Sequence, residues 1–139
     1  MNLRVENINF RGTNEVIYGL NKAANEALNI AKNRKLSYGP RALNKSEAIQ
    51  RGEGALYAYT DMLVNDAQFE DGIIKACKTP EIINKLKETL KPFPLSPEYA
   101  PDKKITPANF LINSIGSALE HSGKGISENV MNFFKRIEM

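Results

Sequence analysis

Apolar side chains recur at helical spacing along most of this chain. Between residues 14 and 31 they return every three or four positions, which predicts an amphipathic helix of about five turns with Thr13 or Asn14 as its N-cap. The helix is expected to end before Tyr38-Gly39-Pro40, because a proline disfavours helical geometry at the residue before it. Its predicted buried face consists of Val16, Ile17, Leu20, Ala23, Ala24, Ala27, Leu28 and Ala31.

A second helix is predicted to end near Asn65. Asn44 and Glu47 have the spacing of a capping box, and an apolar stripe at helical period follows them. Gly52 and Gly54 each weaken the early turns by roughly 1 kcal/mol relative to alanine, which favours a later start. The stripe contains Ala48, Ile49, Leu56, Tyr59, Met62 and Leu63.

Two shorter helices are predicted between residues 66 and 90. Asp66 is the candidate cap of the first, in which Phe69, Ile73 and Cys77 share one face. The alternative is that this segment continues the second helix through a kink. Thr79-Pro80-Glu81 starts the next helix, since a hydroxyl cap, a proline in the first turn and an acidic residue all favour a helix N-terminus. Its predicted buried face is Ile82, Ile83, Leu86 and Leu90.

Prolines interrupt the pattern between residues 92 and 107. They exclude a helix or a central strand, so this segment is predicted to be an extended, polyproline-like crossover. The prolines are Pro92, Pro94, Pro97, Pro101 and Pro107.

Two helices are predicted to close the chain. The first begins at Thr106-Pro107 and ends at the glycine pair Gly123 and Gly125. Ser127 is the predicted N-cap of the second, and Ile126 and Met131 have the spacing of a hydrophobic staple around it. The last helix has a strongly apolar face made of Val130, Phe133, Phe134 and Ile137, which is typical of a helix that closes a core.

These elements predict an all-α fold with one domain over residues 1–139. We expect an irregular or orthogonal bundle of five to six helices, with a short extended arm over residues 1–12 and the proline-rich connection over residues 92–107. The arm is inferred from period-two alternation in LRVENINF, which slips by one position. A chain of 139 residues is long enough to bury a core without disulfides or a structural metal.

Cysteine use and hydropathy favour the cytoplasm. The single cysteine cannot form an intramolecular disulfide, and the N-terminal residues lack the pattern of a signal peptide. No apolar run approaches the roughly 18 residues of a membrane helix. We therefore expect a cytoplasmic protein with no membrane partner.

Charge is segregated in the middle of the chain. Residues 27–52 carry six basic side chains against one acidic, whereas residues 53–71 carry five acidic side chains and no basic one. A basic segment with an aromatic residue is what phosphate contact and base stacking would use. The candidate nucleic-acid contacts are Lys32, Arg34, Lys35, Tyr38, Arg41 and Lys45. A solvated helix end explains the same residues, as does docking on an acidic protein face, including the acidic block of a second copy.

Candidate chemistry is sparse. The one histidine, His121, is expected at a helix C-terminus, where it would interact favourably with the helix dipole, and Cys77 is expected to be a small buried apolar group. No spacing typical of a zinc or metalloprotease site occurs, and residues 118–125 lack the first glycine and the Ser or Thr of a P-loop. We therefore expect no catalytic residues, no cofactor and no metal.

The sequence thus favours a small non-catalytic protein that acts by macromolecular recognition. A protein partner or self-association is the preferred form of this hypothesis. The first alternative is nucleic-acid binding through the basic segment over residues 32–51. The second alternative is an enzyme whose site is assembled from dispersed carboxylates, tyrosines and lysines.

Overall fold

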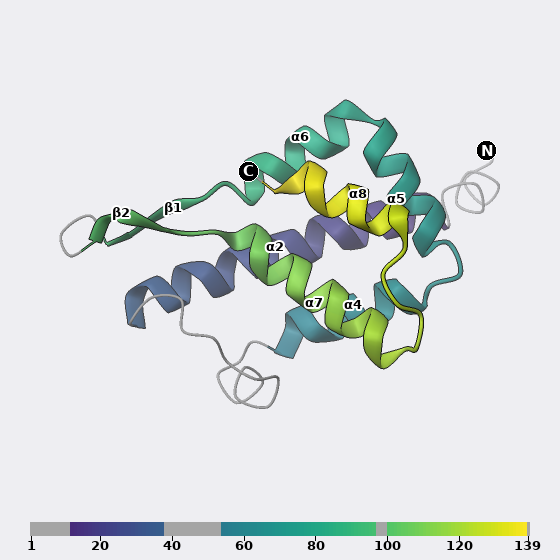
Figure 1. The fold of residues 1–139 in the computed structure, drawn as a ribbon, viewed down its shortest axis with the longest axis horizontal. Helices are drawn as coiled ribbons and strands as arrows, with labels where there is room; N and C mark the ends of the chain where they lie inside the picture. Colours follow the sequence, from purple (N-terminus) through teal and green to yellow (C-terminus); the bar gives the residue numbers. More distant parts are fainter. Residues whose placement is uncertain (1–11, 38–53, 97–99, 139) are drawn as a thin grey trace, which may run out of the picture.

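The computed structural model describes residues 12–37, 54–96 and 100–138 (Figure 1). Within these residues it contains six α-helices and one two-stranded sheet, which confirms the all-α bundle. The predicted arm, apart from Gly12, lies outside the described residues, as do the 38–40 turn and the capping box at Asn44 and Glu47. The elements are α2 (Thr13–Ser37), α4 (Gly54–Asn65), α5 (Phe69–Lys78), α6 (Pro80–Thr89), β1 (Phe93–Ser96), β2 (Ala100–Ile105), α7 (Pro107–His121) and α8 (Glu128–Ile137).

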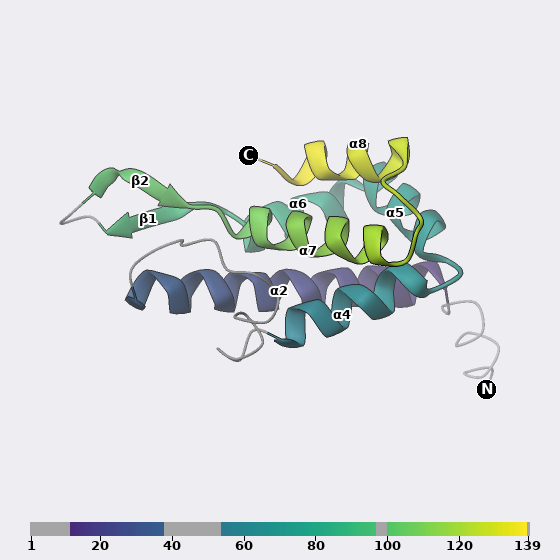
Figure 2. The same cartoon turned by 60° about the horizontal axis from the view of Figure 1, so that its bottom comes forward.

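The long helix α2 is the centre of the bundle. It packs against α4, α5, α6 and α7. In Figure 2, α2 and α4 form the lower layer and α8 lies at the top. The alanines Ala23, Ala24 and Ala27 are completely buried on α2, and such small side chains let neighbouring helices approach closely. Of the buried face predicted for this helix, only Ile17 and Leu28 are partly exposed.

A short turn separates α4 from α5, so the alternative of one kinked helix is wrong. The side chain of Asp66 accepts a hydrogen bond from the Gln68 backbone N–H at 2.8 Å, which stabilises the turn before α5. Phe69 and Ile73 are buried as predicted, while Cys77 is half-buried.

The helices α6, α7 and α8 start where the sequence predicts them, but two of their three predicted hydroxyl caps are not formed. The predicted caps of two other helices are wrong, because α2 already begins at Thr13 and the N-cap of α5 is Gln68 instead of Asp66. Ser127 accepts a hydrogen bond from the backbone N–H of Val130 at 3.2 Å. Thr79 and Thr106 make no such bond. The reason is backbone geometry: ψ is 166° at Ser127 but 99° at Thr79 and 97° at Thr106. The Thr79 hydroxyl donates instead to the carbonyl of Lys75 in the preceding helix.

The proline-rich segment is extended, but the prediction of a polyproline-like crossover is wrong. β1 and β2 pair as an antiparallel ribbon, with Phe93 opposite Ile105 and Pro94 opposite Lys104. A two-stranded sheet consists only of edge strands, and an edge strand tolerates residues that lack a backbone N–H. The ribbon projects beyond the helices in both views (Figures 1 and 2). Ile105, which is only 1% exposed, anchors its end next to α7.

The connection between α7 and α8 is held in place where it leaves α7. Gly123, at φ +70°, follows the helix in the left-handed region. The N–H of Lys124 bonds to the carbonyl of Leu119 and the N–H of Gly123 to that of Glu120, which is a Schellman motif. The Lys124 ammonium group also donates to the carbonyl of Val64, which ties the connection to the end of α4.

A buried pair of hydroxyls links α4 to α7. The side-chain oxygens of Thr60 and Ser114 lie 2.6 Å apart, and both residues are almost completely inaccessible to solvent. The Thr60 hydroxyl also lies 3.1 Å from the carbonyl oxygen of Leu56. The pair is therefore satisfied inside an otherwise apolar interface.

Candidate functional site

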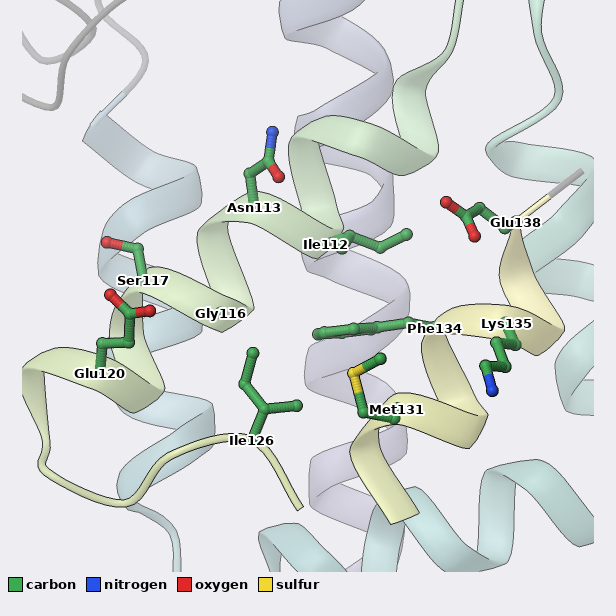
Figure 3. A pocket seen from close by; sticks show the side chains of 10 residues that line it. All are labelled: Ile112, Asn113, Gly116, Ser117, Glu120, Ile126, Met131, Phe134, Lys135 and Glu138. Carbon is green, nitrogen blue, oxygen red and sulfur yellow. The ribbon is translucent and has the colours of Figure 1, made fainter. Parts of the chain in front are cut away.

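An open cavity of about 560 Å³ lies between α7 and α8 (Figure 3). We call it the α7–α8 groove. Its volume falls within the range of roughly 300–1,000 Å³ that is typical of binding pockets. The groove is lined by Ile112, Asn113, Gly116, Ser117 and Glu120 from α7, by Ile126 from the connection, and by Met131, Phe134, Lys135 and Glu138 from α8 and its C-terminal end.

The groove exists because two consecutive helices pack on different partners. α7 packs against α2 and α4, whereas α8 packs against α5 and α6. The apolar face of α8 that includes Val130, Phe133 and Ile137 is buried in this way, as the sequence predicted. The neighbouring side of α8 faces α7 across the groove (Figure 3).

Gly116 keeps the middle of the groove open. A Cβ atom built at this position would meet only the Cδ1 atom of Ile126 within 4 Å, at 3.7 Å. Gly116 is therefore not required by packing inside the protein. A large side chain at this position would fill the groove.

The lining is apolar in the middle and charged at its margins. Ile126 and Met131 are each 42% exposed, and they are two of the four large apolar side chains that the described residues leave exposed. The other two, Tyr18 and Met62, do not line the groove. Figure 3 shows Glu120 and Glu138 on opposite sides of the apolar residues. With Lys135 also present, the lining carries a net charge of −1.

The length of the groove can be estimated from the helices that form it. The lining residues of α7 span positions 112 to 120. At 1.5 Å per residue this is about 12 Å, or two helical turns. The arrangement suits one or two apolar side chains of a short segment, with room for polar contacts at each end.

One serine and one histidine lie next to each other at the end of α7. The Ser117 hydroxyl is 3.4 Å from Nδ1 of His121, and the histidine is exposed. This distance is longer than the roughly 2.6–3.2 Å that ordinarily separates a nucleophile from its base. His121 is the last residue of α7, the place predicted from its interaction with the helix dipole.

The candidate nucleic-acid contacts are only partly covered by the structure. Lys32 is exposed on α2, and Arg34 and Lys35 follow in the same helix. Tyr38, Arg41 and Lys45 lie outside the described residues.

Two further features bear on possible chemistry. Partial burial raises the pKa of the Cys77 thiol above its ordinary value, and the nearby Arg136 opposes this shift. Among the side chains that the structure describes, no three His, Cys, Asp or Glu residues are grouped as a metal site would need.

None of the described helices combines the length and the apolar character of a membrane span.

From the sequence, Phe134 and Lys135 suit either a partner-binding surface or a helix that closes the core, and the second interpretation is preferred; no binding role is assigned to Ile126 or Met131. The sequence pattern predicts that Ile126 and Met131 form a hydrophobic staple, and that spacing is present at the start of α8. The two residues of a staple pack against each other, so the pattern predicts that they are buried. Their exposure follows from the relative positions of α7 and α8, which the pattern does not contain. Comparisons with protein-family models, with curated proteins and with solved structures found no match to this chain.

Proposed function

We propose that this protein acts without catalysis, by binding another protein through the α7–α8 groove. The observation that carries the proposal is the exposure of Ile126 and Met131 around an open apolar cavity. Exposed apolar side chains gathered around a concavity and rimmed by polar groups are typical of protein-binding surfaces. We also propose that the protein is cytoplasmic, as its sequence favours.

The partner is a short amphipathic segment with apolar anchors and basic flanks. A helix laid in a groove between two helices uses anchors drawn from positions i, i+3, i+4 and i+7, and a groove of two turns accommodates one or two of them. Glu120 and Glu138 favour lysine or arginine on either side of those anchors. Lys135 allows an acidic residue at one position of the same segment.

Selection from a random library of helical peptides tests the proposal. Met131→Lys places a charge in the groove, and Met62→Lys makes the same change at a methionine of α4 outside it. We expect the selected peptides to share apolar anchors flanked by basic residues. Their affinity should fall at least tenfold for Met131→Lys, a loss of about 1.4 kcal/mol, and should be unchanged for Met62→Lys.

A second variant separates occupation of the groove from a change in fold. Gly116→Trp fills the groove from α7, at a position where an added Cβ atom meets only Ile126 within 4 Å. It should abolish peptide binding while circular dichroism stays that of the unmodified chain. Failure to select any peptide, or peptides that bind all three variants equally, would overturn the proposal.

A further inference from the structure

The fold brings the basic C-terminal end of α2 and two lysines of the β1–β2 ribbon to one end of the molecule. The last turns of α2, residues 29–37, contain Lys32, Arg34 and Lys35 and no acidic residue. The β1–β2 ribbon contains Lys103 and Lys104, some 70 residues further along the chain. Figures 1 and 2 agree that the C-terminal end of α2 and the ribbon project from the same end of the bundle.

The end of α2 carries the positive charge at this end of the molecule, because the two lysines of the ribbon are balanced in charge by Glu98 and Asp102. Residues 29–37 and 93–105 together hold five basic and two acidic residues, a net charge of +3, which equals that of the whole protein. The side chains of Lys32, Lys103 and Lys104 are exposed. The net positive charge of this end favours an anionic ligand.

The ribbon presents its two lysines on opposite faces. Lys103 and Lys104 are consecutive in β2, and successive side chains of a strand point to opposite sides. A two-stranded ribbon fits the major groove of B-form DNA, which is about 12 Å wide and has a phosphate backbone on each side. A ribbon that lies flat in this groove turns one face toward the bases and its two edges toward the backbones, so the long side chains of the two lysines can reach phosphates, with the end of α2 beside the ribbon.

The prolines of the ribbon disfavour the other use of a projecting hairpin, which is pairing with a strand of a partner. Pro94 in β1 and Pro101 in β2 have no backbone N–H to donate across an edge. Proline on edge strands is a common device that prevents such pairing.

We infer that the β1–β2 ribbon and the C-terminal end of α2 form a second binding surface, whose ligand is duplex DNA held through its phosphates. This surface is separate from the α7–α8 groove, and neither proposal depends on the other. A-form RNA has a major groove too deep and narrow for a ribbon, so B-form DNA is the preferred duplex.

Fluorescence anisotropy of the full chain with a labelled 20-base-pair DNA duplex tests this inference. The same titration uses an RNA duplex of equal sequence and a polyglutamate peptide, and salt is varied from 50 to 200 mM. We expect DNA to bind most tightly, with an affinity that falls steeply with salt because binding releases counterions.

The double variant Lys103→Glu/Lys104→Glu should weaken DNA binding at least tenfold. It should also lower the slope of log affinity against log salt by about 2, since each phosphate contact contributes about 0.9. Lys78→Glu/Lys85→Glu makes the same change in net charge on α5 and α6, at exposed residues, and should leave the affinity within threefold. Lys103→Gln/Lys104→Gln replaces the first variant if charge reversal alters the circular dichroism.

Three results would overturn the inference. One is the absence of DNA binding at 50 mM salt. The second is an equal loss of affinity in the ribbon variant and in its control. The third is RNA or polyglutamate binding as tight as that of DNA, which would assign this surface to a different class of partner.

Discussion

At Gly72 the helices α2 and α5 come so close that a side chain does not fit. A Cβ atom at this position would lie 2.5 Å from Cγ1 and 2.6 Å from Cβ of Val16, which is 1% exposed. Because the Cβ atom of valine lies next to the backbone, rotation of its side chain cannot relieve this contact. The two helices would have to move apart.

Gly72→Ala is therefore expected to lower the free energy of unfolding by about 1–3 kcal/mol, the cost of overpacking a core. Gly116→Ala is the matched control in α7, where the added methyl group is only in ordinary contact with Ile126. It should raise the free energy of unfolding by about 0.5–1 kcal/mol, because alanine is the better helix former. Urea denaturation followed at 222 nm measures both, and equal effects would contradict this account.

At the scale of elements, the sequence identifies where helices begin more reliably than how their ends are satisfied. Ser127, Thr79 and Thr106 each precede a helix, as the capping pattern predicts. Only at Ser127 does the backbone turn the side chain toward a free N–H of the first turn. The Ser127 hydroxyl also donates to the Glu70 carboxylate, which joins the start of α8 to α5.

Ser127→Ala should cost about 0.5–2 kcal/mol of stability through loss of the cap. Thr106→Ala should cost much less, because Thr106 makes no capping bond from its side chain. Thermal unfolding of the two variants beside the unmodified chain checks the difference. A larger loss for Thr106→Ala would mean that residue type, and not backbone geometry, decides capping here.

At the scale of the whole molecule, one apolar core joins all six described helices. The cluster of buried side chains includes members from α2, α4, α5, α6, α7 and α8, so no described helix has a core of its own. A single cooperative unfolding transition is the expected consequence. This unfolding transition is the test of the prediction that residues 1–139 form one domain.

Phe133→Ala removes one of the largest fully buried side chains of this core. We expect a loss of about 3–5 kcal/mol. Far-ultraviolet circular dichroism and tyrosine fluorescence should report the same lowered midpoint, although Phe133 lies on α8 and the three described tyrosines lie on α2 and α4. Separate midpoints for the two probes would show that the helices unfold as independent units.

The sequence by itself determined the helices, most of their boundaries and most of their buried faces. Met62 is the main error, because it belongs to the predicted apolar stripe of the second helix and is 72% exposed. Periodicity and helix-start residues are local properties, so Val130, Phe133 and Ile137 could be assigned to a core without knowledge of what covers them. Proline likewise predicted an extended connection over residues 92–107, and in the described residues helix returns only at Pro107, where α7 begins. The pairing of β1 with β2 could not be predicted in this way, because edge strands tolerate proline and the pattern does not reveal a partner strand.

Only the tertiary structure decided which side chains remain exposed and which charges lie together. Ile126 and Met131 satisfy a staple pattern, yet they line a groove because α7 and α8 pack on different helices. Lys32 and Lys104 are far apart in sequence, and the path of the chain places the end of α2 and the ribbon at the same end of the bundle. Both surfaces arise from contacts between distant segments, and such contacts leave no periodic signal in the sequence of either segment.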